Sequence, residues 1–325
     1  MDQKFFEVKK KHHHVWADYL RRWSHDGVKV YHTTLKRNII NESVRGVAME
    51  QHFYRLTSLS DFDVSVILNF SEKADSELQK LHKSYLADFL KFQKIQQIYE
   101  ASGRPDSTTD CAIKALESKL MENLHSAHER EVSPILRALA NGQLSMLYEN
   151  KNILAFTTFL GHQITRTKNM KDKVFASPDN SVPGMRELSA SMKNSWWFLS
   201  YMLGMNLGRE LYLFRDRYTH TLLRNNSSVP FITSDQPVIN VHDTVWKDEK
   251  GAPESVDLYY PISPSFAYLI AESKKFKGGV SDVCETEALG FNKKIAARAN
   301  THIVGVSEES LRPLLSLIGL DRLPQ

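Results

Sequence analysis

Residues 230–240, PFITSDQPVIN, have the apolar and β-branched composition of a strand, but Ser234-Asp235 and then Pro237 interrupt it. Proline lacks an amide hydrogen, so the strand cannot keep both hydrogen-bond ladders there. Asp235 either closes an Asx turn on its own backbone or projects from the strand end. Functional side chains are often held where a rigid scaffold meets a loop. Asp235 is therefore a candidate catalytic residue, and Ser234 a candidate substrate-binding residue.

The strand pattern recurs on both sides of this stretch. Runs of β-branched and aromatic residues with near alternation predict strands, and they occupy residues 26–35 (DGVKVYHTTL), 44–56 (VRGVAMEQHFYRL), 255–263 (SVDLYYPIS), 266–272 (FAYLIAE) and 301–306 (THIVGV). We also expect a helix over residues 282–300 and a last helix that begins at Ser307.

Between the two strand regions, apolar residues recur three and four positions apart, which is typical of amphipathic helices. Ser71 fits an N-cap ahead of acidic residues, and the predicted helices cover 71 to about 100, 110–141, 143–170 and 185–225. The sequence thus predicts a single α+β domain, residues 1–325. Its mostly antiparallel sheet, formed from N- and C-terminal strands, packs against a large central helical block, residues 71–226.

The composition allows several classes of function and disfavours others. Lys and Arg exceed Asp and Glu by 42 − 38 = 4, a mildly basic balance that permits RNA or DNA as a partner without requiring one. The two cysteines, Cys111 and Cys284, are too few for a disulfide scaffold and favour the reducing cytoplasm. The N-terminus lacks the apolar run of a signal peptide. The apolar stretch 195–208 is shorter than a membrane span, so we expect a buried helix and no membrane partner.

Two polar residues fall on the apolar side of the helix predicted over 143–170. Gln163 continues the stripe that contains Phe156 and Leu160, and Arg166 stands one turn beyond it. A satisfied core amide and a local ion pair explain the pattern. The alternative is a binding site, because the planar guanidinium of arginine can bind both oxygens of a phosphate or carboxylate. Gln163 and Arg166 are therefore candidate substrate-binding residues.

Glu122, His125 and Glu129 share one face of the preceding helix. Two carboxylates and an imidazole could bind a divalent metal such as magnesium or manganese, although helical-bundle metal sites use the Glu-x-x-His pattern twice and this chain shows it once. A charged outer helix face is the alternative. Pro134 should kink this helix and could turn Glu129 inward.

Residues 9–23, KKKHHHVWADYLRRW, combine cations with His, Trp and Tyr. In nucleic-acid binding, cations contact phosphates and aromatic rings stack on bases. The same composition also suits a solvated lysine tail beside an aromatic anchor of the core.

These features together resemble DUF4238, a widespread bacterial family of domains of unknown function, over residues 13–300. The family motifs are an opening His-Tyr-Val-Pro-x-x-Tyr-Leu-like run, a mid-chain Gln-x-x-Arg and a Ser-Asp-x-Pro near the C-terminal strands. They fall here on His13, Tyr19, Leu20, Gln163, Arg166, Ser234, Asp235 and Pro237, and Asn292 in GFNKKIAARA adds to the match. Trp16 stands where the family usually has proline, so this chain departs from the family pattern three positions after His13.

The resemblance implies no established activity, but it gathers polar residues from distant segments, as an assembled active site does. His13 would act as a general base or metal ligand, Glu129 and Asp235 as catalytic carboxylates, and Gln163, Arg166, Ser234 and Asn292 as substrate-binding residues. These parts favour a nuclease in bacterial defence against phage. A non-catalytic module that binds nucleic acid or protein and a helical-bundle metal oxygenase are the alternatives. The nuclease requires His13, Glu129, Gln163, Arg166 and Asp235 to line one pocket.

Overall fold

The computed structural model describes residues 8, 11–176, 182–243 and 255–320. The strands are β1 (Lys11–His13), β2 (Lys29–Thr33), β3 (Ile39–Ser43), β4 (Met49–Gln51), β5 (Thr219–Asn225), β6 (Thr233–Ser234), β7 (Ile239–Asn240), β8 (Asp257–Pro261), β9 (Phe266–Ala271), β10 (Gly279–Val283) and β11 (Ile303–Gly305). The α-helices are α1 (Ala17–Leu20), α2 (Asp61–Ser71), α3 (Ser76–Ala101), α4 (Ser107–Ala140), α5 (Asn150–Thr165), α6 (Lys168–Ala176), α7 (Met185–Asn194), α8 (Trp196–Leu213), α9 (Glu285–Arg298) and α10 (Glu308–Leu311).

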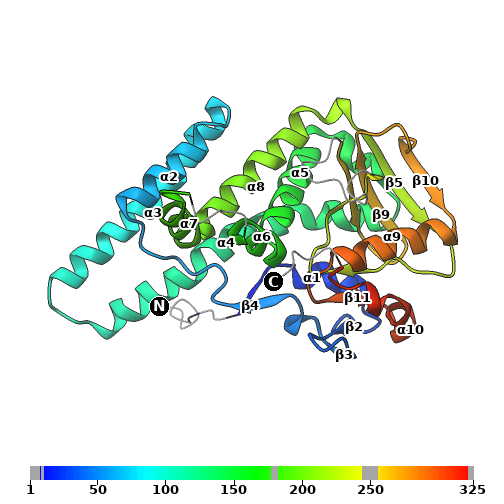
Figure 1. Ribbon diagram of the computed structural model, residues 1–325, viewed down its shortest axis with the longest axis horizontal. Coiled ribbons are helices and arrows are strands. Elements are labelled where there is room, and N and C mark those ends of the chain that lie inside the picture. Colours follow the sequence, from blue (N-terminus) through cyan, green and yellow to red (C-terminus); the bar gives the residue numbers. More distant parts are fainter. Residues whose placement is uncertain (1–7, 9–10, 177–181, 244–254, 321–325) are drawn as a thin grey trace.

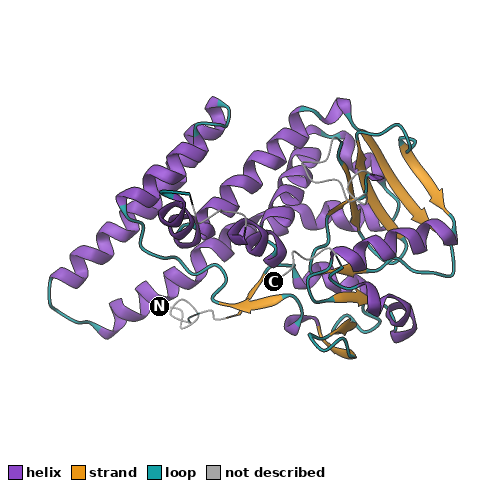
Figure 2. Ribbon diagram, viewed as in Figure 1, coloured by secondary structure: helices purple, strands orange, loops and turns teal. Residues whose placement is uncertain are grey.

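Strands from the two ends of the chain share a sheet, and this confirms the predicted α+β fold. In the antiparallel sheet β3-β2-β11-β6, Val304 of β11 pairs with His32 of β2 on one side and with Thr233 of β6 on the other. The remaining strands are divided between a sheet in the order β10-β5-β9-β8-β7 and the two-stranded ribbon β1-β4. Only the β10-β5 pair of the larger sheet is parallel. The strands lie mostly in one half of the molecule, while α2, α3 and one end of α4 extend from the other (Figures 1 and 2).

The helical region starts earlier than the sequence predicts. Ser71, predicted as an N-cap, instead ends α2, whose own N-terminus is closed by a reciprocal capping box between Ser60 and Asp63. The next helix, α3, is capped by Asp75, whose side chain accepts the amides of Glu77 and Leu78. α4 continues past Pro134 as a helix.

The predicted helix over residues 185–225 is wrong beyond Leu213. Residues 219–225 form β5, which pairs with β9 on one side and β10 on the other. Alternating Thr219 and Thr221 suit a strand, and pairing on both edges of β5 overrides the apolar spacing that suggested a helix. The predicted helix over 282–300 is likewise shorter, because β10 ends at Val283 before α9 begins.

Two long helices, α5 and α8, pack backbone to backbone and form the framework beneath the polar centre described below. A Cβ atom on Gly161 would collide with the carbonyl oxygen of Gly204, and one on Gly208 would lie 2.6 Å from the Cα of Thr158. Glycine at these positions therefore permits the close approach. As predicted, the apolar stretch 195–208 is a largely buried helix, α8. In the part of the chain that the structure describes, no helix combines the length and apolarity needed to cross a membrane.

The N-terminal segment is joined to the C-terminal strands by buried hydrogen bonds. Tyr19 on α1 donates its hydroxyl hydrogen to the carbonyl of Pro261 over 2.7 Å and lies 2.7 Å from the hydroxyl of Thr233. Trp23 donates its indole N–H to the carbonyl of Phe231 over 2.7 Å. These bonds therefore join α1 to C-terminal segments that lie more than 200 positions away in the chain.

Replacement of Tyr19 by phenylalanine tests this connection. Tyr19→Phe keeps the ring but leaves the buried carbonyl of Pro261 without this donor, and we expect a loss of about 1–3 kcal/mol in the free energy of unfolding. Urea titration followed by circular dichroism measures it. Tyr148→Phe is the matched control, because the Tyr148 side chain is exposed. Equal stability of both variants and the wild type would contradict the structural role of the Tyr19 hydroxyl.

Candidate functional site

A polar cavity of about 170 Å³ lies between the N-terminal segment and helices α4 and α5. We call it the Arg166 cavity; its lining consists of His13, Trp16, Ala17, Tyr54, Glu122, His125, Ser126, Glu129 and Arg166. A single buried water needs roughly 10–15 Å³ on this measure, so the cavity has room for several waters or for a chemical group of a ligand. Of the five residues expected to share one pocket, His13, Glu129 and Arg166 line this cavity. Gln163 and Asp235 are not among its lining residues.

Arg166 stands at the centre of the polar network. The helix predicted over 143–170 breaks there, since α5 ends at Thr165 and Arg166 is its C-cap. The Arg166 guanidinium donates from Nη1 to Glu129 Oε1 over 2.7 Å and from Nη2 to Gln163 Oε1 over 2.9 Å. Gln163 in turn donates through Nε2 to the carbonyl of His14 over 3.1 Å. Arg166 and Gln163 together therefore connect α4, α5 and the N-terminal segment.

Because Arg166 and Glu129 are both buried, the stability of each charge depends on the other. Arg166 and Glu129 are only 2% and 8% exposed. Burial by itself lowers the pKa of Arg166, but the charge and hydrogen bond of Glu129, together with the nearby Tyr54 and Tyr260, outweigh burial and keep the pKa above its usual value. The desolvation of each ion costs several kcal/mol and is offset only while the partner is present.

A cluster of neutral imidazoles packs against Arg166. The rings of His162 and Tyr201 stack with centroids 4.5 Å apart, and those of His128 and His162 stack at 4.7 Å. His128 Nε2 lies 3.0 Å from the Tyr201 hydroxyl. Burial lowers the pKa of His125 and His162 well below the usual value, and the charge of Arg166 acts in the same direction. These rings are therefore neutral at physiological pH.

Several buried polar atoms of the cavity lining have no hydrogen-bond partner among the residues that the structure describes. They are Arg166 Nε, the Tyr54 hydroxyl and both ring nitrogens of His125. Burial raises the pKa of Tyr54, so its hydroxyl keeps its proton. A buried donor without a partner is costly, and such groups around an open cavity favour a ligand or water that carries acceptor oxygens. This arrangement can stabilise negative charge on a bound group.

His13 lies at the half-buried edge of the cavity, on the ribbon β1-β4 opposite Met49. Its Nε2 lies 3.1 Å from the carbonyl of Arg45. A carbonyl can only accept, so the hydrogen sits on Nε2, and Nδ1 carries the lone pair when the ring is neutral. His13 is therefore suited to exchange a proton through Nδ1.

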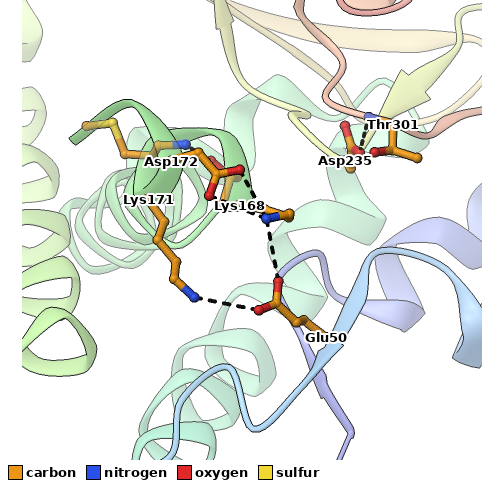
Figure 3. A network of polar contacts seen from close by, with 8 residues as sticks. Glu50, Lys168, Lys171, Asp172, Asp235 and Thr301 are labelled. Carbon is orange, nitrogen blue, oxygen red and sulfur yellow. Dashed lines mark hydrogen bonds and ion pairs between the residues drawn. The ribbon is translucent and has the colours of Figure 1, made fainter. Parts of the chain in front are cut away.

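Two lysines of α6 hold the ribbon that carries His13. Lys168 and Lys171 approach the carboxylate of Glu50 on β4 at 3.9 and 3.6 Å, and Lys168 also pairs with Asp172 at 3.0 Å (Figure 3). The Lys171 ammonium also lies 4.6 Å from the ring centroid of Phe53. These contacts link β4, and through it β1, to α6.

Asp235 is engaged in the backbone and is not among the residues that line the Arg166 cavity. Its carboxylate accepts the amides of Asn300 and Thr301 at 2.7 Å and of His302 at 2.9 Å, and Figure 3 shows it turned to Thr301. Burial raises the pKa of Asp235, and the amides act against that shift. The Asp235 side chain thus holds the loop that precedes β11. The predicted placement of Asp235 in one cavity with Arg166 is therefore wrong.

Two further candidates also make structural hydrogen bonds. The Ser234 hydroxyl donates to the carbonyl of Gln236 over 2.9 Å and accepts the Gln236 amide at 3.1 Å, which closes a tight turn. Asn292 accepts the amide of Ile232 at 3.0 Å and donates to the carbonyl of Pro230 over 2.9 Å. Both side chains therefore hold the strand segment around β6 in place.

Glu122, His125 and Glu129 face inward, so the alternative of a charged outer helix face is wrong. In residues 11–176, 182–243 and 255–320, no three His, Cys, Asp or Glu side chains are grouped closely enough to hold a metal ion. The helical-bundle metal centre is thus not assembled by these residues. Dependence on magnesium or manganese stays a prediction, because Mg²⁺ can be held by one or two carboxylates together with substrate phosphates.

The sequence reasoning missed Tyr54 and the stacked pair His162 and Tyr201. Tyr54 follows β4 in a run that reads as a strand, and His162 and Tyr201 stand in apolar helices. His162 is a histidine in an otherwise apolar part of α5, directly before Gln163. Its position in the sequence was as informative as that of the glutamine.

Comparison with family models matches residues 11–309 to a family described as protein of unknown function (DUF4238). Neither the curated proteins nor the solved structures include a match to the chain.

Removal of one member of the ion pair should cost more than removal of both. Arg166→Met removes the cation that pairs with the buried Glu129, and we expect a loss of about 3–5 kcal/mol in the free energy of unfolding. The double variant Arg166→Met/Glu129→Met should recover most of that loss. Urea titration of the wild type, both single variants and the double variant gives the coupling energy. Additive losses would contradict a direct pairing.

The buried imidazoles predict acid lability. Burial lowers the pKa of His128 to about 4, whereas an unfolded histidine titrates near 6.5. The unfolded chain therefore binds more protons between these values, and folding stability should fall as pH decreases from about 6.5. Urea midpoints across this range measure the loss. His128→Asn should reduce the dependence of the urea midpoint on pH. His25→Asn is the control, because His25 is exposed, and it should leave that dependence unchanged. If His128→Asn also leaves it unchanged, His128 is not a source of the acid lability.

Proposed function

The chain belongs to the DUF4238 family of proteins of unknown function, and on that premise we propose that it cleaves phosphodiester bonds in nucleic acid, with the Arg166 cavity as its active site. The observation that carries the proposal is a set of buried polar groups that have no partner among the described residues: Arg166 Nε, the Tyr54 hydroxyl and the ring nitrogens of His125. They lie beside the imidazole of His13 and the carboxylates of Glu122 and Glu129. Cleavage of a phosphodiester requires stabilisation of negative charge on phosphorus-bound oxygens and transfer of protons. The cavity provides groups for both.

Within this proposal, the roles differ from those expected from the sequence. Arg166 contacts the phosphate through Nε, while Glu129 and Gln163 position its guanidinium. Glu122, a wall residue of the cavity, replaces Asp235 as the second acidic group. His13 exchanges the proton at the edge. Ser234 and Asn292 act by holding the fold.

A non-catalytic module that binds nucleic acid or protein is the second candidate. The observation that favours it is the structural role of Asp235, whose carboxylate is occupied by three backbone amides. Such a module needs the basic and aromatic surface but no close proton-transfer groups. A cytoplasmic role in defence against phage is compatible with both candidates, and plating of phage on cells with and without the gene tests it.

The two candidates separate in a cleavage assay. Purified protein is incubated with labelled tRNA, single-stranded RNA and plasmid DNA, with magnesium, manganese or a chelator. We expect cleavage of at least one substrate, reduced about 10²–10⁴-fold in His13→Gln. His25→Gln is the matched control, because His25 Nε2 also contacts a backbone carbonyl, that of Val306 at 2.9 Å, but on the exposed surface.

Equal cleavage by His13→Gln and the wild type would place the activity outside the Arg166 cavity. Retention of RNA on a filter without cleavage under all three conditions would support the binding module and contradict the nuclease.

A further inference from the structure

We infer, building on the proposed nuclease function, that the substrate is single-stranded RNA and that its own 2′-hydroxyl is the attacking group. The cavity supplies a proton acceptor, a proton donor and fixed hydrogen-bond donors on its walls. Those are the parts needed for internal transesterification, in which the nucleophile comes from the substrate. DNA lacks this hydroxyl, so the same cavity would leave DNA intact.

Glu122 is the group that accepts the 2′-hydroxyl proton. Its neighbour His12 fixes its position: His12 Nδ1 accepts the Tyr54 amide at 2.9 Å, so the ring hydrogen sits on Nε2. That nitrogen lies 3.8 Å from Glu122 Oε2. His12 is fully buried and acts as a positioning residue for the Glu122 carboxylate.

His13 is the group that protonates the leaving oxygen. In its protonated form, Nε2–H continues to donate to the carbonyl of Arg45, and Nδ1–H is given to the leaving 5′-oxygen. The half-buried edge of the cavity lets this ring regain a proton from solvent between turnovers, which the buried and neutral His125 does not allow.

The step balances without a co-reactant. The 2′-oxygen loses its proton to Glu122 and forms a bond to phosphorus, while the bond from phosphorus to the 5′-oxygen breaks and that oxygen takes the proton of His13. The products are a 2′,3′-cyclic phosphate and a 5′-hydroxyl end. Arg166 Nε–H, the Tyr54 hydroxyl and a His125 N–H stabilise the negative charge on the phosphoryl oxygens as the bonds change.

The cavity edge favours an unpaired strand. Trp16 is half-buried there beside His13, and bases of single strands stack on such aromatic rings. The donors that contact the phosphate are buried, so the backbone of the substrate must enter the cavity. The backbone of a base-paired duplex is too rigid to bend into such a cavity.

A chimeric substrate tests the inference directly. A labelled single-stranded oligodeoxynucleotide with one ribonucleotide is incubated with the full-length protein in the presence of a chelator, beside the all-DNA and all-RNA oligonucleotides. We expect a single cut on the 3′ side of the ribonucleotide, a cyclic phosphate on the upstream product and no cut in the all-DNA strand. Gel mobility before and after acid opening of the cyclic phosphate identifies the end.

Variants connect this cut to the cavity. Glu122→Gln and His13→Gln should each slow it about 10²–10⁴-fold, whereas Glu131→Gln, at an exposed site on the same helix, and His25→Gln should not. Circular dichroism and urea titration of each variant separate a loss of chemistry from a loss of fold.

Cleavage of the all-DNA strand, 5′-phosphate ends, or an absolute need for magnesium or manganese would overturn internal attack and leave the nuclease proposal standing. If neither RNA nor DNA is cut under any of these conditions, both proposals fall.

Discussion

The buried ion pair between Arg166 and Glu129 is the constraint on which the interior of this protein depends. Neither ion can be left alone in a low-dielectric interior, so any arrangement of the chain that separates α4 from α5 loses several kcal/mol. Gln163 extends the requirement to the N-terminal segment through the carbonyl of His14. Segments from three parts of the sequence are thus held around one guanidinium, and the cavity lies where they meet.

The permanent charge of Arg166 also favours the neutral form of the histidines around it. Guanidinium groups do not lose their proton in proteins, so each imidazole packed nearby is favoured in its neutral form, and burial acts in the same direction for His125 and His162. The interior of the site therefore combines the Arg166 cation and its counter-ion Glu129 with neutral imidazoles. Proton exchange with solvent is left to the edge, where His13 is only half-buried.

The sequence predicts the fold class and part of the site because both depend on local pattern. Gln163 and Arg166 are polar residues in an apolar stripe, and such residues need a partner or a function wherever they are buried. Asp235 gives the same local signal, but its partners are the amides of residues 300–302, about 65 positions away. The apolar spacing around residues 219–225 predicts a helix, but these residues form β5. The strand forms because it pairs with β9 and β10, which lie more than 40 positions later in the chain.

The family motifs contain residues with structural roles and residues that are candidates for function, and the sequence alone does not distinguish them. The hydrogen bonds that each side chain makes do distinguish them. Asn292 has both ends of its amide engaged by backbone, and Asp235 holds three backbone amides. Their polarity is accounted for by the fold. Arg166 makes two strong contacts, yet its Nε has no partner among the described residues. The described part of the fold therefore does not account for all of its hydrogen-bonding capacity. Where no activity is known, buried polar groups that lack hydrogen-bond partners beside a cavity indicate a functional site better than polar groups that the fold already satisfies. Stability alone would favour an apolar residue at such a position.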